Sequence, residues 1–366
     1  MRFLFLTGFL AFALGVATIG CNDNEETNAG TSSGTLPGED GGSSSGSSSG
    51  FSSSGGGGGG TFWYISRRTQ LVGISDLSGA DVWSELVDEG QLSALTIGAG
   101  SAWVLTKEGN LRRYDLTTHE LVTIASVAKN PHYMTFAAGA VWVTDDNDDS
   151  ACADIDNGPT KLLRVDPASN QVVARIPITA TDDFPCNRFN GLGTDGTLVY
   201  PLIHNNFGIT VVDPATNTVT KRAALGATSG GYGAGYLAVG SGALWVHDTN
   251  AKTLLAIDPS TLAVKTTTPL TADYLGEQMV ASATAVVMDK PGETVLRVDV
   301  ADPTKQEEKT LADAPDAFIL HDGTLYATVR HDLSANLLTL DQTTLAESKR
   351  TPLPPLSSID ELVFVP

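Results

Sequence analysis

The sequence predicts an all-β protein, a seven-bladed β-propeller closed by pairing its C-terminal strand with its first blade. The first observation behind this prediction is a recurring phrase, which reads LLRVDPAS at 162–169, ITVVDPAT at 209–216 and LLAIDPST at 254–261. Six copies carry an aspartate, and these aspartates are Asp115, Asp166, Asp213, Asp258, Asp299 and Asp341, with spacings of 51, 47, 45, 41 and 42 residues. A supersecondary unit that recurs at such a period is typical of a β-propeller.

The second observation is the internal division of each repeat. In one repeat, four short runs follow one another at 236–240, 243–247, 254–258 and 263–267, and we label them a to d from the axis outward. They are rich in β-branched and aromatic residues and are separated by Gly, Asn, Asp and Pro, which predicts strands joined by turns. Seven b runs can be counted, at 62–65, 102–105, 140–143, 197–200, 243–246, 285–288 and 324–327.

The ring closure follows from the count of a runs. Only six a runs precede the C-terminal region, and the seventh, 359–365, has no b run after it. We therefore expect 359–365 to become the inner strand of the first blade, because this pairing protects the strand edges at both ends of the fold. The c run of that blade, 71–76, differs in phase from the others.

The region before the repeats has the pattern of an export signal. A positive start at 1–2 and an apolar stretch at 3–19 are followed by Gly20 and Cys21, and this stretch is too short to be a spanning helix. The segment ATIGC, 17–21, resembles the bacterial lipoprotein signal, with threonine at the position where that family usually has leucine. The resemblance implies lipidation of Cys21 and a membrane-surface anchor, and ordinary secretory cleavage is the alternative.

Three segments result. We expect a lipoprotein-type signal peptide at 1–20, a lipidated cysteine with a disordered Ser/Gly-rich tether at 21–60, and the propeller at 61–366. The chain has 42 acidic and 22 basic residues, a net charge of −20. Nucleic acid is therefore excluded as a partner, because its phosphates would be repelled, whereas cationic ligands or divalent metal ions suit this field.

Two recurring residue types have structural roles in our interpretation. Trp103, Trp142 and Trp245 stand at matching positions of the b runs, which predicts packing between neighbouring sheets. The repeated aspartate, followed by proline in several copies, begins a turn in which its carboxylate accepts backbone N–H bonds. We therefore assign these aspartates no catalytic role.

The unit GSGALWVHDTNAKTLLAIDPSTLAVKTTTPL, 240–270, resembles the YVTN-type β-propeller repeat and is similar to the repeats of streptogramin lyases and quinoprotein-like propellers. The resemblance covers 61–366 and implies the scaffold, since these families differ in their sites. Streptogramin lyases use a Glu-x-His metal pair, which this chain lacks. Gluconolactonase-type propellers bind a metal through Glu, Asn and Asp of inner strands; Glu277, Asn190 and Asp316 lie near such positions without an aligning motif.

The longest insertions fall on one face of the predicted ring. The a–b connections are tight, whereas 145–160 is a long b–c connection and 179–188 and 226–235 are long d–a connections. Functional residues are concentrated on such loops. Cys152 and Cys186 lie in two of these insertions, and export favours a disulfide between them, with two exposed thiols as the alternative.

The acidic insertion DDNDDSACADIDNG, 145–158, is a candidate metal site, because calcium binds several carboxylate and carbonyl oxygens. Its spacing does not fit an EF-hand loop, so a solvated acidic loop is the alternative. The tentative metal ligands are Asp145, Asp146, Asp148 and Asp149, and calcium is the one cofactor that the sequence suggests.

The starts of the inner strands should line the channel mouth on the same face. The candidate binding residues there are His132, Arg188, Asn190, Tyr236, Gln278 and Asp316. Such a set could perform general acid–base chemistry, or it could plug the channel through mutual hydrogen bonds.

These features predict a lipid-anchored β-propeller at the bacterial cell envelope, facing the periplasm or the cell surface. We expect it to act as a binding module for an envelope protein, a glycan, a peptide or a small molecule, because no catalytic motif is present. We expect a monomer that contacts the membrane through its anchor only. The alternatives are a metal-dependent lyase or hydrolase with its site at the channel mouth, and a redox protein with a quinone cofactor.

Overall fold

The computed structural model describes residues 60–88, 90–146, 160–178, 188–203, 208–225, 234–270, 278–290, 292–331, 334–353 and 359–365. The chain divides into two units, Met1–Gly56 and Gly57–Pro366, and every described residue belongs to the second. The predicted signal peptide, lipidated Cys21, the tether up to residue 59, the pair Cys152 and Cys186, and Asp148 and Asp149 lie outside the described residues.

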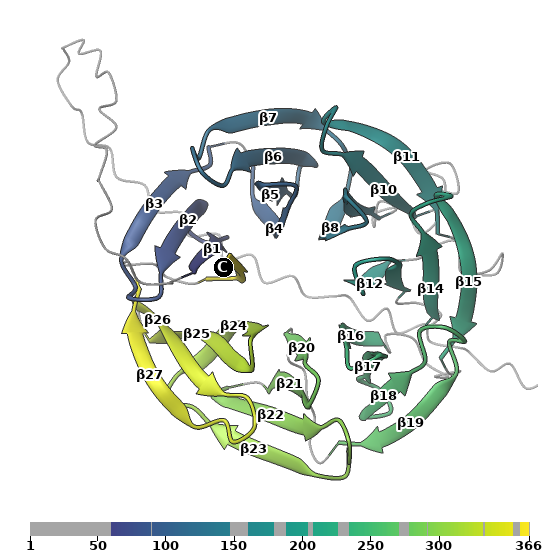
Figure 1. The fold of residues 1–366 in the computed structure, drawn as a ribbon, viewed down its shortest axis with the longest axis vertical. Helices are drawn as coiled ribbons and strands as arrows, with labels where there is room; N and C mark the ends of the chain where they lie inside the picture. The colour runs from purple at the N-terminus through teal and green to yellow at the C-terminus, as the bar shows by residue number, and fades with distance from the viewer. Residues whose placement is uncertain are drawn as a thin grey trace, which may run out of the picture. The chain divides into compact units, whose positions relative to one another are not determined.

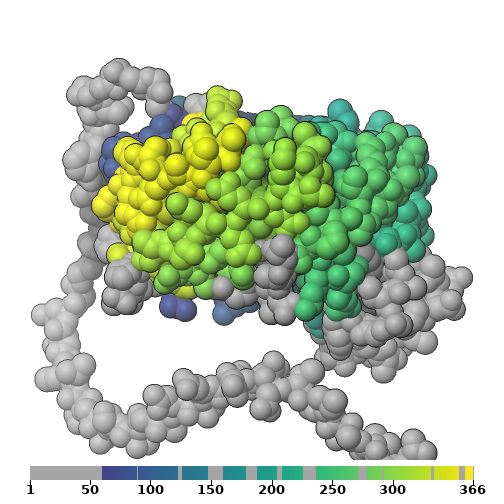
Figure 2. All heavy atoms as spheres, turned by 90° about the horizontal axis from the view of Figure 1, so that it is seen from below, coloured from purple at the N-terminus to yellow at the C-terminus, as the bar shows by residue number. Residues whose placement is uncertain are grey.

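Seven four-stranded antiparallel sheets surround a central axis as the blades of a propeller (Figure 1). Successive blades lie side by side in chain order around the ring (Figure 2). The hydrophobic core lies between blades: one cluster, for example, combines Trp103 of the second blade with Val143 of the third. Because each blade is covered by two neighbours, its b and c strands are buried on both faces, which explains their nearly continuous apolar sequences.

The a strands face the axis and are β28 (Glu361–Val365), β4 (Leu92–Gly98), β8 (Pro131–Ala137), β12 (Phe189–Thr194), β16 (Ala234–Gly240), β20 (Met279–Ala281) and β24 (Ala314–His321). The b strands are β1 (Thr61–Ser66), β5 (Ser101–Thr106), β9 (Ala140–Asp145), β13 (Val199–Ile203), β17 (Ala243–Asp248), β21 (Ala285–Lys290) and β25 (Thr324–His331). The c strands are β2 (Leu71–Asp76), β6 (Asn110–Asp115), β10 (Lys161–Asp166), β14 (Gly208–Asp213), β18 (Thr253–Ile257), β22 (Thr294–Asp299) and β26 (Ser334–Asp341). The outer d strands are β3 (Asp81–Leu86), β7 (Leu121–Ser126), β11 (Gln171–Pro177), β15 (Thr218–Ala224), β19 (Val264–Pro269), β23 (Gln306–Thr310) and β27 (Glu347–Pro352).

The predicted ring closure is confirmed. The first blade has the strand order β28-β1-β2-β3, so its inner strand comes from the C-terminal region. In the antiparallel register of β1 and β28, Trp63 pairs with Val363 and Tyr64 pairs with Leu362. The first c strand, β2, pairs with β1 without a register shift despite its different sequence phase, and its pairing with β3 shifts between Ile74 and Ser75.

The fourth blade differs from the prediction at one end. The b run was expected at 197–200, but β13 begins only at Val199. The carboxylate of Asp195 accepts hydrogen bonds from the backbone amides of Thr197 and Leu198, each at 2.8 Å. These bonds hold the chain in a turn, and the strand therefore starts two residues later.

Three tryptophans of the b strands make the same contact in their blades, which explains why they recur within the chain. Trp103, Trp142 and Trp245 are buried, as expected for packing between sheets. Each indole Nε1 donates to the carbonyl oxygen five residues earlier, at 3.0, 3.1 and 3.2 Å respectively. The indole therefore fills the space between blades while its polar atom ties the b strand to the end of its a strand.

One face of the ring consists of short turns, and we call it the turn face; it holds the a–b turns, such as 99–100, and the c–d turns, such as 167–170. The two-residue a–b turns have positive φ at both positions, for example 48° at Ala138 and 73° at Gly139, as hairpin turns of this length require. In the c–d turns the repeated aspartate accepts amide hydrogen bonds, as expected. For Asp115 these come from Thr117 N and Thr118 N, both at 2.8 Å.

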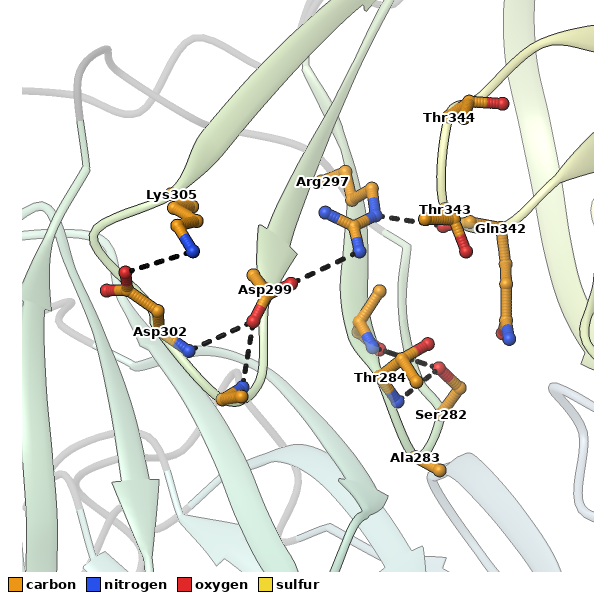
Figure 3. Close-up of polar contacts among 12 residues, drawn as sticks. Ser282, Ala283, Thr284, Arg297, Asp299, Asp302, Lys305, Gln342, Thr343 and Thr344 are labelled. Carbon is orange, nitrogen blue, oxygen red and sulfur yellow. Dashed lines mark hydrogen bonds and ion pairs between the residues drawn. The ribbon is translucent and has the colours of Figure 1, made fainter.

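Arginines of the c strands connect neighbouring blades at the turn face. Arg164 Nη1 donates to Pro214 O and Asn217 Oδ1 of the next blade, both at 2.8 Å, and its guanidinium lies 5.6 Å from the centroid of the Trp142 ring. Arg297 on β22 repeats the contact with a single bond, from Nε to Gln342 O at 2.9 Å, beside the Asp299 turn (Figure 3). The c–d turn of one blade is thus held by the blade before it.

The opposite face, which we call the loop face, carries the b–c and d–a connections. The three long insertions begin and end at this face, as predicted. They connect β9 to β10, β11 to β12, and β15 to β16. Throughout the described part of the chain, no helix is both long and apolar enough to span a membrane.

Candidate functional site

A cavity of about 500 Å³ lies on the propeller axis towards the loop face, within the size range of small-molecule sites. Residues near the starts of all seven inner strands line it, together with the residues that follow β1 and β5. The polar lining residues are Arg67, Ser93, Lys107, His132, Tyr133, Asn190, Tyr236, Gln278 and Glu361. The larger apolar lining residues are Leu95, Met134, Leu192, Leu237, Met279, Phe318, Leu362 and Val363.

Register shifts at the starts of inner strands bring polar side chains to this cavity. The pairing of a and b strands shifts between Leu92 and Ala94 in the second blade and between Phe189 and Gly191 in the fourth. Equivalent shifts occur in the third, fifth and seventh blades. A β-bulge bends its strand and redirects a side chain, which here concerns Ser93 and Asn190.

Four of the six predicted channel-mouth residues line the cavity, and these are His132, Asn190, Tyr236 and Gln278. The other two, Arg188 and Asp316, are not among the lining residues. Arg188 is exposed just before β12, and Asp316, at the bulge between Pro315 and Ala317, is mostly buried beside Arg330. Whether the four bind a ligand stays a prediction.

Sequence reasoning missed three charged lining residues, Arg67, Lys107 and Glu361. Glu361 is the first residue of the C-terminal strand β28, which is the inner strand of the first blade. The expectation that the starts of inner strands line the channel mouth therefore also covers Glu361. Arg67 and Lys107 each follow directly after a b strand, at the same end of their blades. The ends of b strands are therefore a second sequence signal for the mouth.

Arg67 and Glu361 form an ion pair across the closure of the ring. Arg67 Nη2 lies 2.8 Å from Glu361 Oε1 and donates to Ser93 O at 2.6 Å, while Glu361 Oε2 accepts from Leu95 N at 2.6 Å. Burial in the channel raises the pKa of Glu361 to about 7, although Arg67 and the Leu95 amide oppose the shift. Solvent still reaches 25% of this side chain, because it faces the cavity.

Asp316 lies behind this wall in a second charged cluster. Its Oδ1 is 3.4 Å from Arg330 Nη2, and within the described structure its buried Oδ2 has no hydrogen-bond partner. Burial raises the pKa of Asp316 to about 6 against the effect of Arg330, and the nearby Asp360 adds to the rise. Asp360 accepts from Arg67 N at 2.7 Å, so it links the two clusters.

Two of the four tentative metal ligands lie in the described structure, and their carboxylates bind protein groups. Asp145 Oδ1 accepts from the backbone amides of Lys129 and Asn130, at 2.8 and 3.0 Å. Asp146 Oδ1 accepts from Phe189 N at 3.0 Å, and its Oδ2 lies 3.5 Å from His132 Nε2. Asp146 thus joins the third and fourth blades and orients His132 at the cavity.

The residues that line this cavity are suited both to acid–base chemistry and to hydrogen bonding. A carboxyl group with a pKa of about 7 and an imidazole share it, and neutral amide and phenol groups complete its wall. In the described part of the chain, no three His, Cys, Asp or Glu side chains are placed to hold one metal ion. The calcium prediction is therefore neither supported nor tested, because half of its proposed ligands lie outside the described residues.

Fold and cavity define the chain as a seven-bladed β-propeller with a polar central cavity. The sequence matches no protein-family model and no curated protein. Solved structures share the fold: dihydro-heme d1 dehydrogenase NirN, in complex with DHE, is 12% identical with a TM-score of 0.54, covering 82% of this chain and 74% of that one. AztD from Citrobacter koseri is 11% identical with a TM-score of 0.57, covering 84% and 99%, and its apo form is 12% identical with a TM-score of 0.53, covering 84% and 98%.

Proposed function

We propose that this protein is a lipid-anchored binding module of the bacterial cell envelope, which holds a small polar ligand in its central cavity. The observation that carries the proposal is the cavity itself, which is about 500 Å³ in volume and is lined by residues of all seven blades, with polar side chains from six of them. Hydrogen bonds and an ion pair hold Arg67 and Glu361 in its wall. A preorganised polar cavity binds with little loss of side-chain entropy.

The binding half of the proposal is tested with the mature protein and a library of sugars, sugar acids, amino acids and short peptides, by thermal shift followed by calorimetry. The variant Asn190→Leu with Gln278→Leu removes two neutral polar groups from the cavity wall and should abolish binding of any hit. Lys305→Gln is the matched control, since Lys305 is 73% exposed in a c–d turn on the turn face. Hits that bind the double variant unchanged would place the ligand elsewhere and contradict the proposal.

The anchoring half is tested separately by detergent-phase partitioning of the full chain expressed in a bacterial host. Lipidation of Cys21 would place the wild-type protein in the detergent phase, whereas Cys21→Ala should move it to the aqueous phase. Cys152→Ala, a substitution within the predicted propeller region 61–366, is the control and should leave partitioning unaltered. A wild-type chain that stays in the aqueous phase would exclude the anchor.

A metal-dependent lyase or hydrolase is the second candidate, and one observation favours it: the cavity contains Glu361, whose pKa of about 7 suits a general acid or base. Metal analysis of the purified protein, with melting curves in calcium, magnesium and EDTA, tests this candidate. It requires bound metal and a melting temperature that EDTA lowers; identical curves and no bound metal exclude it.

A further inference from the structure

We infer that the ligand of the central cavity is a small organic anion whose charged group is held by Arg67 and Lys107. This inference rests on the proposed binding function and specifies the chemical class of the ligand. Both cations lie on the wall formed by the first and second blades, after β1 and β5. The wall formed by the fourth to sixth blades carries neutral hydrogen-bonding groups instead.

The charge of the cavity is opposite to that of the protein. The chain as a whole carries a net charge of −20, yet the lining contains two basic side chains, Arg67 and Lys107, and a single carboxylate, Glu361. A concave lining with an excess of basic side chains focuses a positive potential on the space between its walls. An anion is the ligand that this arrangement favours.

Arg67 is preorganised for this role. Its Nη2 is held by Ser93 O and Glu361 Oε1, and its backbone amide is held by Asp360 Oδ2, so the guanidinium is fixed at the ring closure. Its Nε is a buried donor for which the described structure provides no acceptor, and 39% of the side chain remains accessible. A fixed, planar guanidinium is suited to carboxylate recognition.

Lys107 supplies a second and more adaptable charge. Its backbone amide donates to Gln91 O at 2.7 Å, which fixes the chain where β5 ends. Its side chain is exposed, and no described residue forms a hydrogen bond or an ion pair with its ammonium group. An ammonium group on a flexible stem can follow the ligand, whereas Arg67 defines the position of the anionic group.

Glu361 is the resident counter-ion that the ligand would replace. The charged or titratable groups near it in the cavity wall are Arg67 after β1, Asp360 before β28, Lys107 after β5 and His132 on β8, which pairs with Asp146; Asp316, Arg330 and Arg68 form the cluster beside Asp360. An anion beside Arg67 would repel the Glu361 carboxylate, which would then take a proton from solvent. Binding should therefore be coupled to the uptake of up to one proton above about pH 7.

The neutral wall indicates what else the ligand contains. Asn190, Tyr236 and Gln278 offer amide and phenol groups, which hydrogen-bond hydroxyl and carbonyl groups without adding charge. A molecule with an anionic end and a hydroxylated body fits both walls. Hydroxy acids and sugar acids are the class that combines these features.

The test compares D-glucuronate with D-glucose, a pair that differs by one carboxylate, using calorimetry and melting curves of the mature protein with sodium chloride as the ionic-strength control. Glucuronate should bind at least about tenfold more tightly than glucose, because an ion pair of this kind adds roughly that factor. Lys107→Gln should weaken glucuronate binding by about tenfold and leave glucose binding unchanged. Lys305→Gln should change neither. Calorimetry in two buffers of different ionisation enthalpy, at about pH 8, should show proton uptake that Glu361→Gln abolishes.

The outcomes separate this inference from the proposed function. If glucose and glucuronate bind equally, if Lys107→Gln has no effect, or if only neutral library compounds bind, the ligand is not an anion and the binding function survives. The same conclusion follows if glucuronate does not bind but a neutral compound does. If no compound binds at all, both the inference and the proposed function are overturned. Arg67→Lys serves as a second variant, which keeps the charge and should selectively weaken the carboxylate ligand.

Discussion

The two faces of the propeller are held by different kinds of interaction. On the turn face, hydrogen bonds are local or join adjacent blades: the repeated aspartates bind amides two and three residues ahead, as Asp258 binds Ser260 and Thr261 at 2.8 and 3.0 Å, and Arg164 reaches the next c–d turn. On the loop face, the important contacts join distant segments, as Arg67 and Glu361 do across 294 residues. The turn face is thus specified repeat by repeat, whereas the loop face is specified once, by the whole ring, and this leaves it free to hold a site.

The largest effect is expected where the turn face meets the core. Trp142 is fully buried, and its indole bonds to Ala137 O beside the a–b turn. Trp142→Ala should lower the free energy of unfolding by about 3–5 kcal/mol, measured by urea denaturation, because it leaves a cavity and an unpaired carbonyl. Val173→Ala on the outer strand β11, where Val173 is 52% exposed, is the control and should have little effect. Similar losses in both variants would mean that the blades are not packed as described.

Asp195 tests the local bonding of the turn face. Its carboxylate accepts from Thr197 N, Leu198 N and, at 2.7 Å, the Tyr200 hydroxyl. Asp195→Ala should lower the free energy of unfolding by about 2 kcal/mol, and Tyr200→Phe by less, because only one bond is lost. Burial opposes ionisation of Asp195, but these hydrogen bonds outweigh it and lower its pKa. The stabilisation is therefore present above the unfolded pKa of 3.8 and disappears as pH falls through the lower folded value.

The contribution of Glu361 to the free energy of unfolding should depend on pH in the opposite direction to that of Asp195, which distinguishes the loop face from the turn face. The pKa of Glu361 rises from 4.5 to about 7 on folding, so the folded state binds the proton more tightly than the unfolded state. The free energy of unfolding should then fall as pH increases from about 4.5 to about 7, by about 1–2 kcal/mol for a partly accessible group. Glu361→Gln should flatten this slope in denaturation series at successive pH values, whereas Lys305→Gln should not. A slope unchanged in Glu361→Gln would show that the channel does not perturb this carboxyl group.

The smallest expected effect is a gain. In the described structure Tyr64 has a buried hydroxyl without a hydrogen-bond partner, and its ring packs against Gly73 in the first blade. Tyr64→Phe removes this unpaired group and should raise the free energy of unfolding by up to about 1 kcal/mol, measured by urea denaturation. A loss of stability would reveal a partner for the hydroxyl. Tyr114→Phe is the comparison, because the Tyr114 hydroxyl accepts from Arg112 Nε at 3.0 Å and its removal should destabilise.

The same contrast between the faces explains what the sequence could predict. The roles of Trp142 and Asp166 and the tight turns could be predicted because each depends on a pattern within one repeat, and blade number and ring closure could be predicted by counting those repeats. Arg67 was missed because its role depends on Glu361 and Ser93, which only the closed ring brings near. Asp316 is not among the lining residues, and its burial beside Arg330 depends on contacts between strands that the pattern of one strand does not reveal.

The position of β28 in the chain has a consequence for the order of events during biosynthesis. Glu361 and its neighbours are translated after every other strand, and until they pair with β1 the ring is open and Arg67 lacks its counter-ion. An incomplete chain therefore presents the exposed edge of β1 and an unfinished cavity, and a ligand that requires the complete cavity would bind only after β28 has paired.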